Sequence, residues 1–474
     1  MPVADLWTID EIVAATGGVV DGQPPSAFGG VTIDSRAVQP RDIFVAIKGV
    51  SLDGHDFAAA ALAAGAGIAV VSRPDPAMRA AGPLLVVDDA LEALGRLGRA
   101  ARARTSSRVI AVTGSVGKTT TKEALRLALS GQGETHASAS SFNNHWGVPL
   151  SLARLPRSAR FAVFEIGMNH AGEILPLTAL VRPHVAVVTE IAPSHLGHFP
   201  SLEAIADAKA EIFTGVEPGG VAVLNRDSPF FGRLEGAARQ AGITEVVGFG
   251  RNEASDVRLK SVALHETCSC VTAVVFGDEL IYKLGSPGEH LVMNSLAVLA
   301  AARLAGGDLA RSALALAALT PPKGRGVRFT VKLPEGEAVV IDESYNANPV
   351  SVAAALAVLS RARPGRGGRR IAVLGDMLEL GAEGPALHAG LAKAIDGSGV
   401  DVLYASGPLM RHLWDAVPAS RRGRHVATSE ELKEPLLREL KDGDVIMVKG
   451  SLGSRMGPLV EAIRTRFPSA AGGA

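Results

Sequence analysis

The sequence contains few cysteines, few aromatic residues and no excess of charge of either sign. Only two of its 474 residues are cysteines, so a framework of disulfide bonds is excluded. Its 48 Lys and Arg residues balance 48 Asp and Glu residues. A neutral chain has no long-range field to draw it to nucleic acid or to an anionic membrane. Any anionic ligand must therefore be held by local contacts.

Long hydrophobic runs are also absent. No apolar stretch reaches the length that crosses a bilayer, and the first residues carry acids where a signal peptide needs basic residues. These absences predict a cytoplasmic enzyme or binding protein with no membrane insertion. Cys268 and Cys270 alternate along a strand-like stretch, and no further Cys or His follows at finger spacing. The pair is therefore interpreted as ordinary strand thiols rather than a zinc site.

Short apolar runs alternate with helix-length segments along the chain, and the length suggests about three domains. Residues 1–104 mix short strand candidates with Ala-rich helix, residues 105–320 carry continuous apolar strands, and residues 321–474 repeat the strand-helix alternation. Continuous apolar runs indicate strands buried on both faces of a parallel sheet. We predict an α/β protein with a smaller N-terminal α/β domain, a central phosphate-loop domain and a C-terminal doubly wound, Rossmann-like domain.

The stretch "VIAVTGSVGKTTTKEAL", residues 109–125, joins an apolar strand to a helix through glycines. Backbone N–H groups at a helix N-terminus favour phosphate oxygens. Lys118 is placed to reach the β and γ phosphates of ATP, and the Thr119 hydroxyl to ligate Mg²⁺. Val112 stands where the full phosphate-loop pattern has its first glycine, so the match is the shorter Gly-x-x-Gly-Lys-Thr. The predicted ATP-binding loop comprises Thr113, Gly114, Ser115, Val116, Gly117, Lys118, Thr119 and Thr120.

Three further residues lie where such a loop needs partners. Glu165 ends the apolar stretch "FAVFE", His195 follows another strand, and Lys209 lies in a helical stretch. Taken singly, they are more often a solvated acid, a loop histidine and a surface lysine. Beside a phosphate loop, Glu165 is predicted as a second ligand of Mg²⁺.

Eight segments, in order and at the expected separations, resemble the Mur ligase family of ATP-dependent amide-bond ligases in bacterial cell-wall synthesis. They are "TGSVGKTTTKE", "FNNHWGVPLSLARLP", "FEIGMNHAGEI", "APSHLGHF", "AKAEIF", "GEHLVMNSLAVLAAA", "DESYNANPVSVAAAL" and "VLGDMLELG". The resemblance covers nearly the whole chain. It implies catalytic roles for Lys118, Glu165, His195 and Lys209, with His195 at or near the magnesium and Lys209 at the family's carbamylated lysine.

The same resemblance implies contacts to the nucleotide. His290 and Asn294 are expected at the base, Arg325 at the phosphates and Asp342 at the ribose. Glu343 stands where the family usually has a second aspartate.

Substrate contacts are implied as well. In the first domain "TIDSRAVQPRDIF" resembles the segment that holds a uridine nucleotide, and Arg41 stands there where the family often has glycine. The implied contacts are Ser35 and Arg36 to the uridine nucleotide, Asn143 and Asn144 near the nucleotide and acceptor end of the site, and Asn346 and Asn348 to the incoming dipeptide or the nucleotide.

Within the family, "SYNANP" and "GDMLELG" are similar to the member that adds D-alanyl-D-alanine to UDP-N-acetylmuramoyl-tripeptide. That activity implies ATP and Mg²⁺, an acyl-phosphate intermediate, small-molecule substrates and a monomer. Three alternatives stay open. They are a folylpolyglutamate-synthetase-like or cyanophycin-type ligase, a phosphate-loop switch or motor ATPase, and a nucleotide-binding module.

Overall fold

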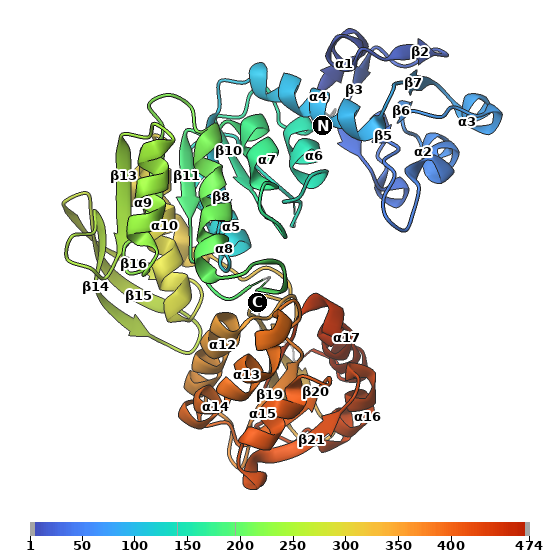
Figure 1. Ribbon diagram of the computed structural model, residues 1–474. Coiled ribbons are helices and arrows are strands. Elements are labelled where there is room, and N and C mark those ends of the chain that lie inside the picture. Colours follow the sequence, from blue (N-terminus) through green and yellow to red (C-terminus); the bar gives the residue numbers. More distant parts are fainter. Residues whose placement is uncertain (1–4, 140, 195, 470–474) are drawn as a thin grey trace.

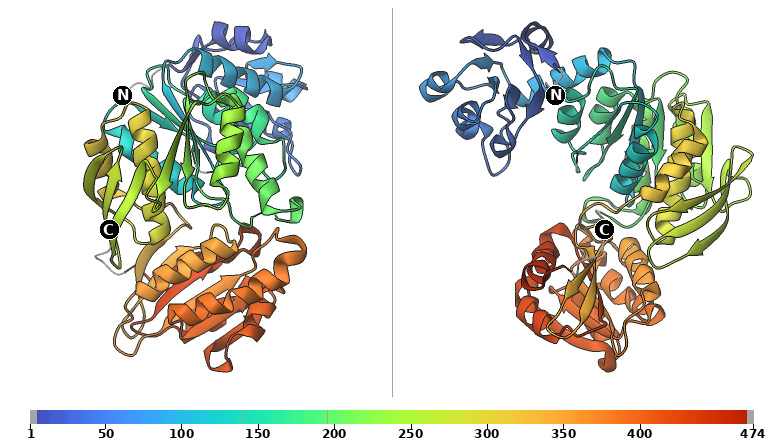
Figure 2. Two further views of the ribbon diagram at one scale, coloured as in Figure 1. Left: turned by 60° about the vertical axis from the view of Figure 1, so that its left-hand side comes forward. Right: turned by 180° about the vertical axis from the view of Figure 1, so that it is seen from behind.

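The computed structural model describes residues 5–139, 141–194 and 196–469. Its sheets form three successive bodies, and the central body contacts both others (Figures 1 and 2). The predicted three-domain α/β fold is confirmed. Among the described residues, no helix has both the length and the apolar character needed to cross a bilayer.

The N-terminal body is built on a five-stranded sheet of order β2-β7-β6-β5-β4, beside a two-stranded pair, β1-β3. The short strand candidates of this part form the five-stranded sheet, in which only β2 runs antiparallel to its neighbour. The elements are β1 (Trp7–Thr8), α1 (Ile9–Thr16), β2 (Val19–Asp21), β3 (Ala27–Phe28), β4 (Gly30–Thr32), η1 (Ser35–Ala37), β5 (Asp42–Val45), η2 (Gly54–Phe57), α2 (Ala58–Ala63), β6 (Ile68–Val71), α3 (Pro76–Ala81), β7 (Leu84–Val86) and α4 (Ala90–Ala103). Arg41 adopts φ +66°, the left-handed conformation that glycine adopts most easily.

The central body holds a nine-stranded sheet of order β16-β15-β14-β13-β12-β11-β8-β10-β9. Seven strands, from β9 to β14, run parallel, whereas β15 and β16 extend the edge as antiparallel strands that the sequence analysis did not place. The strands are β8 (Arg108–Thr113), β9 (Thr135–Ala137), β10 (Phe161–Glu165), β11 (Val185–Val188), β12 (Val221–Asn225), β13 (Glu245–Gly250), β14 (Val257–Leu264), β15 (Ser269–Val275) and β16 (Asp278–Leu284).

Helices cover both faces of this sheet. One face packs against α5 and α10 through a core that includes Ile110, Leu125 and Leu296, and the other packs against α6, α7, α8 and α9. The helices and 3-10 turns of this part are α5 (Lys118–Ser130), α6 (Gly147–Ala153), α7 (Ile174–Val181), η3 (Leu196–His198), α8 (Leu202–Ala210), η4 (Glu211–Gly215), α9 (Phe231–Gln240), α10 (Glu289–Leu304), α11 (Leu309–Ala315) and η5 (Leu316–Ala318).

The C-terminal body has a six-stranded sheet of order β17-β18-β22-β19-β20-β21, parallel except for the edge strand β17. Helices α12 to α15 pack on one face, and α16 and α17 on the other. The elements are β17 (Val327–Lys332), β18 (Glu337–Glu343), α12 (Pro349–Arg361), β19 (Arg370–Gly375), η6 (Gly381–Glu383), α13 (Gly384–Gly390), α14 (Ala392–Ser398), β20 (Val402–Ser406), α15 (Met410–Ala416), η7 (Ala419–Arg421), β21 (Arg422–Val426), α16 (Ser429–Glu439), β22 (Val445–Lys449), η8 (Leu452–Ser454) and α17 (Met456–Arg466).

Different contacts join the central body to its two neighbours. Helix α4 packs against α6, and the indole N–H of Trp7 donates to the carbonyl of Ala153 at 2.8 Å. On the other side, the backbone N–H of Gly197 donates to the carbonyl of Glu379 at 2.9 Å, and Arg328 pairs with Glu266. The central body is therefore tied to both neighbours by side-chain or backbone bonds.

The packing of α10 on the central sheet predicts a test of stability. Leu296→Ala should destabilise the central body by about 2–5 kcal/mol, because it leaves a cavity at a fully buried position. Thermal unfolding should show a midpoint lower by several degrees. Arg303→Ala, an exposed position on the same helix, should leave the midpoint nearly unchanged. An equal midpoint for both variants would contradict the assignment of Leu296 to the core.

Candidate active site

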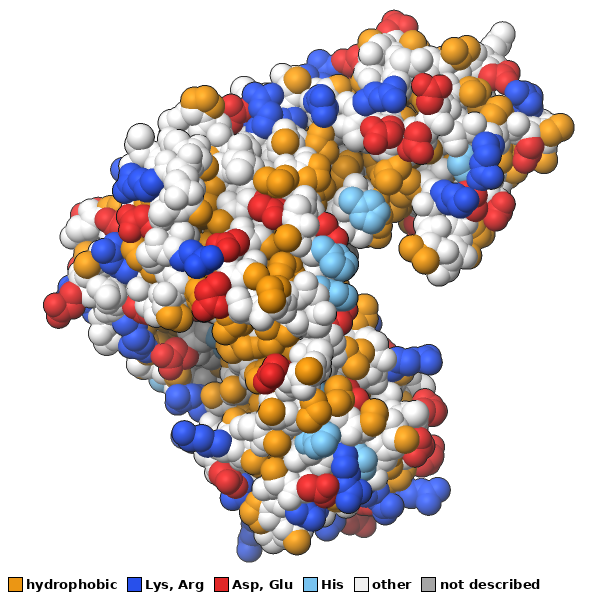
Figure 3. Space-filling model, viewed as in Figure 1, with side chains coloured by type: hydrophobic (Ala, Val, Ile, Leu, Met, Phe, Trp, Pro, Cys, Tyr) orange, Lys and Arg blue, Asp and Glu red, His pale blue; other side chains and the backbone are white. Residues whose placement is uncertain are grey.

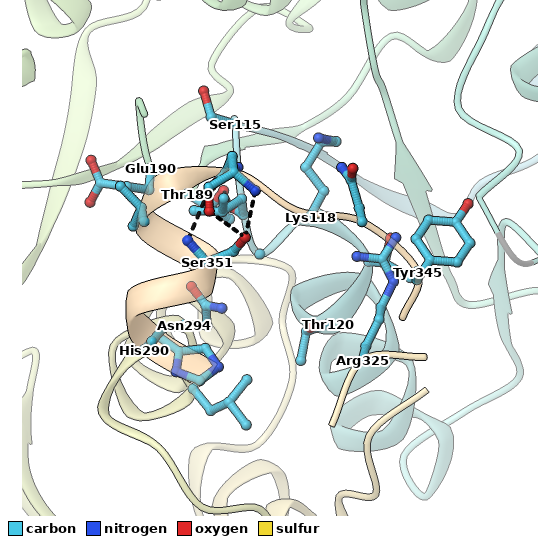
Figure 4. A pocket seen from close by; sticks show the side chains of 18 of the residues that line it. Ser115, Lys118, Thr120, Thr189, Glu190, His290, Asn294, Arg325, Tyr345 and Ser351 are labelled. Carbon is cyan, nitrogen blue, oxygen red and sulfur yellow. Dashed lines mark hydrogen bonds between the residues drawn. The ribbon is translucent and has the colours of Figure 1, made fainter. Parts of the chain in front are cut away.

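A cavity of about 430 Å³ opens between the central and C-terminal bodies (Figure 4). Its walls come from the carboxyl ends of central strands, from α5 and α10, and from the C-terminal residues that follow β18 and end β22. Parallel sheets place their ligands at this edge, because loops and helix N-termini meet there.

The phosphate loop forms one wall of the cavity. Gly114 and Gly117 have φ of +146° and +86°. A Cβ on Gly114 would lie 2.0 Å from Thr189 Oγ1, and one on Gly117 would lie 2.7 Å from Asn294 Nδ2. The loop therefore needs glycine at both positions, where backbone must pass close to neighbouring side chains.

Lys118 begins α5, and its Nζ donates to the carbonyl of Gly114 at 2.8 Å, inside the loop. Burial lowers the pKa of Lys118, the carboxylate of Glu165 opposes that shift, and Arg325 adds to it. Lys118 is thus influenced by one further cation, Arg325, and by one carboxylate, Glu165. A phosphate bound at the loop would favour the charged form of Lys118.

Glu165 ends β10 beside the phosphate loop and is 1% exposed. Thr119 Oγ1 donates to its Oε2 at 2.8 Å, and Asn143 Nδ2 donates to its Oε1 at 2.7 Å. A hydroxyl beside a carboxylate supplies the hard oxygen donors that Mg²⁺ prefers. No group of three or more His, Cys, Asp or Glu side chains in the described parts of the chain could hold a metal. These residues fit an ion that keeps several water ligands, as Mg²⁺ does.

Two of the predicted catalytic residues need separate comment. His195 lies outside the described residues, and Lys209 does not line the cavity. Lys209 lies in α8 and is 1% exposed. Burial is the main cause that places the pKa of Lys209 well below its usual range, and the charge of Lys118 lowers it further. The amine of Lys209 is therefore close enough to Lys118 to interact with it, and it favours the neutral form.

The predicted base contacts lie on one face of α10. His290 and Asn294 both line the cavity, one helical turn apart (Figure 4). Burial lowers the pKa of His290, while the carboxylate of Glu343 opposes that shift. Arg325 lies beside them with its guanidinium over the ring of Tyr345, 4.2 Å from the ring centroid.

The two acids at the end of β18 face opposite ways, as neighbouring residues of a strand do. Asp342 is 1% exposed and does not line the cavity; its Oδ1 accepts from the N–H and the hydroxyl of Ser344, at 3.1 and 2.6 Å. Glu343 lines the cavity, with Oε2 3.3 Å from Lys449 Nζ. The sequence analysis expected Asp342 at the nucleotide, but Glu343 is the acid that reaches the cavity.

The predicted substrate contacts lie in three places. Asn143, Asn346 and Asn348 line the cavity. Asn144 does not line it, and its Oδ1 accepts from the N–H of Gly147 at 2.9 Å, at the start of α6. Ser35 and Arg36 lie in η1 of the N-terminal body, away from the cavity.

Thr113 and Gly114 contribute no lining either, whereas Ser115, Val116, Gly117, Lys118, Thr119 and Thr120 all do. Thr113 is fully buried at the end of β8.

Arg36, in the N-terminal body, is exposed and forms an ion pair with Asp34 at 2.8 Å.

Several polar cavity residues were not predicted. Glu190 is held by the N–H of Ile191 and the side chain of Asn225, and burial raises its pKa. Lys449 donates to the carbonyl of Asn346 at 2.9 Å. The signal was available, because most of these residues end or directly follow an apolar strand whose carboxyl end faces the cavity. The unpredicted lining includes Thr189, Glu190, Asn225, Tyr345 and Lys449.

The architecture defines a class, a three-domain nucleotide-dependent enzyme whose phosphate loop faces a doubly wound domain across one cavity. Family models match the three parts in turn. The Mur ligase family catalytic domain matches residues 27–102, the Mur ligase middle domain residues 112–302, and the Mur ligase glutamate ligase domain residues 327–452. The chain belongs to the Mur ligase family.

Relatives cover nearly the full length. The chain is 35% identical over 437 residues to the UDP-N-acetylmuramoyl-tripeptide–D-alanyl-D-alanine ligase of Escherichia coli K12, covering 92% of this chain and 93% of that protein. A crystal structure of MurF from Acinetobacter baumannii superposes with a TM-score of 0.84 at 31% identity, covering 98% of this chain and 100% of that chain.

The MurF ligase of Thermotoga maritima, solved in complex with ADP, superposes with a TM-score of 0.75 at 27% identity, covering 92% of this chain and 97% of that chain. The predicted enzyme class, an ATP-dependent ligase that forms amide bonds, is confirmed.

The two ends of α5 offer a matched test of the phosphate loop. Gly117→Ala should weaken binding of a fluorescent ATP analogue at least tenfold, about 1.4 kcal/mol, because the new Cβ meets Asn294 at a left-handed φ. Gly131→Ala, at the other end of the helix, meets no atom within 4 Å at an ordinary φ of −77° and should bind normally. Equal affinities for the two variants would refute the packing described for the loop.

Proposed function

We propose that this chain joins D-alanyl-D-alanine to UDP-N-acetylmuramoyl-tripeptide with ATP, giving UDP-N-acetylmuramoyl-pentapeptide, ADP and phosphate in peptidoglycan precursor synthesis. The observation that carries the proposal is the shared cavity. Lys118 and Glu165 line the same cavity as Arg325 and Asn346. Over nearly its whole length, the chain is also similar to UDP-N-acetylmuramoyl-tripeptide–D-alanyl-D-alanine ligases. We further propose a cytoplasmic monomer that uses Mg²⁺, with domain boundaries near residues 104 and 320.

The first chemical step makes a leaving group, since a free carboxylate resists attack by an amine. A carboxylate oxygen of the tripeptide attacks the γ phosphorus of ATP, the bond to the bridging oxygen breaks, and ADP leaves. Lys118 and Arg325 neutralise charge on the phosphoryl group as it moves between the two oxygens. Mg²⁺, held by Thr119 and Glu165, would supply further charge neutralisation at the phosphates.

The second step forms the amide. The neutral amine of D-alanyl-D-alanine attacks the acyl carbon, the tetrahedral intermediate expels phosphate, and the nitrogen loses one proton. Water competes for the same acyl phosphate, so the cavity must exclude it. Asn346 and Asn348, on the C-terminal wall, are placed to orient the incoming dipeptide, opposite Asn143 on the central wall.

Nucleotide recognition is assigned to both walls. His290 and Asn294 would hold the base, and Glu343, rather than Asp342, would face the ribose. Ser35 and Arg36 would hold the uridine nucleotide in the N-terminal body. The surface is hollowed between the N-terminal and C-terminal bodies (Figure 3). This hollow leaves room for a substrate that would reach from the N-terminal body to the cavity.

The deciding experiment is an assay of phosphate release from ATP and Mg²⁺. We expect release only when UDP-N-acetylmuramoyl-tripeptide and D-alanyl-D-alanine are both present, with the pentapeptide product identified by mass spectrometry. Equal release with neither substrate would favour a switch or motor ATPase. Release that requires a folate or a cyanophycin primer would assign the chain to another amide ligase.

Lys209 generates a separate prediction, because a neutral amine is the form that reacts with CO₂ to give a carbamate. The burial that lowers the pKa of Lys209 makes that form more accessible than it is for an exposed lysine. With ¹³C-bicarbonate, the enzyme should show a carbamate carbonyl signal by NMR that Lys209→Arg lacks. The same variant should lose at least a hundredfold in kcat. A wild-type spectrum without that signal would rule out the carbamate.

A further inference from the structure

Lys122 is a lysine with no solvent exposure, one helical turn beyond Thr119 on α5. Residues three apart on a helix share a face, so Lys122 points to the same side as the hydroxyl that bonds Glu165. An ammonium group buried in this way costs several kcal/mol unless it is paired and hydrogen-bonded. The groups that the Lys122 ammonium contacts are therefore the groups that it can hold in position.

Among the described residues, Ser138 and Glu123 contact the Lys122 ammonium. Its Nζ donates to the carbonyl of Ser138 at 2.6 Å and lies 2.8 Å from Glu123 Oε1. Glu123 is partly exposed and also pairs with Arg126. The contact with Glu123 balances the charge, whereas the contact with Ser138 connects α5 to the chain that follows β9.

Ser138 is bonded in turn to the strand that carries Glu165. The N–H of Glu165 donates to Ser138 Oγ at 3.1 Å, and the N–H of Ser138 donates to the carbonyl of Val163 at 3.1 Å. A continuous path of hydrogen bonds thus runs from Lys122 through Ser138 to the backbone of Glu165.

Asn143, further along the same connection, completes the support. Its side chain donates to Glu165 Oε1 at 2.7 Å, and its carbonyl accepts from the N–H of Gly167 at 2.8 Å. The carboxylate is therefore clamped between the hydroxyl of Thr119 on α5 and the amide of Asn143. Lys122 bonds Ser138, on the same connection that carries Asn143.

We propose that Lys122 is a positioning residue for the magnesium site: it fixes Ser138, and thereby the backbone and carboxylate of Glu165, at the distance from Thr119 that a shared Mg²⁺ needs. The proposal rests on the proposed use of Mg²⁺ with the nucleotide. Lys122 itself touches neither nucleotide nor substrate.

A merely structural lysine predicts a different result. Methionine has a similar length and no charge, and the remaining Glu123 is partly exposed and keeps its pair with Arg126, so the variant leaves no buried carboxylate unpaired. If Lys122 only fills space, Lys122→Met should bind nucleotide as the wild type does. If it positions Glu165, the variant should stay folded and lose the effect of the metal.

The test compares ADP binding with Mg²⁺ and with EDTA by isothermal titration calorimetry, which needs no acceptor substrate. We compare the ratio of ADP affinity with Mg²⁺ to ADP affinity with EDTA. We expect this ratio to be at least tenfold smaller in Lys122→Met than in the wild type, while the affinity in EDTA stays within twofold of the wild type. Ser138→Ala keeps the carbonyl but removes Oγ, and should show the same selective loss. Lys122→Arg, which retains a donor, should recover part of the gain.

Glu123→Gln is the matched control, because its amide oxygen still accepts from Lys122 and the bond to Ser138 remains. It should keep the full effect of Mg²⁺. A full Mg²⁺ effect in both Lys122→Met and Ser138→Ala would overturn the positioning role. So would an equal loss with Mg²⁺ and with EDTA in Ser138→Ala, which tests the path even if Lys122→Met fails to fold.

The two proposals can fail separately. Wild-type enzyme whose ADP affinity does not respond to Mg²⁺ would overturn the metal site, and the positioning role with it. Wild-type enzyme that responds to Mg²⁺ but makes no pentapeptide would overturn the proposed reaction and leave the role of Lys122 standing.

Discussion

The hydrogen bond from Thr119 to Glu165 is the contact on which the geometry of the cavity depends. It joins the first turn of α5 to the carboxyl end of β10, so the phosphate loop and the neighbouring strand keep one fixed separation. A buried carboxylate without donors would be costly, and here two side chains supply them. The side chains that satisfy Glu165, Thr119 and Asn143, both line the cavity where the proposed phosphoryl transfer would take place.

Charge in this chain is balanced overall but not locally. Lys118, Lys209 and Arg325 influence one another's environment, since Arg325 lowers the pKa of Lys118 and Lys118 lowers that of Lys209. Glu165 is the carboxylate that opposes them at Lys118. A neutral protein can thus bring Lys118 and Arg325 together at one buried site, where interactions with phosphate are screened least. These two local cations would hold an anionic substrate without a long-range field.

Local patterns predicted the parts of the fold that depend on local physics. The strand and the phosphate loop follow from an apolar run and glycine spacing, and the structure has the strand at Arg108–Thr113, with the loop directly after it. The antiparallel strands β15 and β16 were not placed, because alternating strands carry no signal of which sheet edge they join.

The same limit explains the mixed outcome at the cavity. His290 and Asn294 could be paired from their spacing, because helix periodicity fixes which residues share a face. Glu343 and Asp342 could not be told apart, because adjacent strand residues point to opposite faces and the register decides which one reaches the cavity. That register pairs Glu343 with Lys449, a residue 106 positions away. The end of an apolar strand marked Lys449 as a candidate, but its partner could not be read from local sequence.

The cavity is also incomplete from either body alone. The central body supplies the phosphate loop and Glu165, while the C-terminal body supplies Glu343, Asn346 and Lys449. A site divided in this way can admit large substrates before the acyl phosphate forms and exclude water afterwards, which a cavity within one rigid sheet could not do as readily. The division between bodies is therefore a requirement of the chemistry: an intermediate that water destroys must be made where the walls can come together.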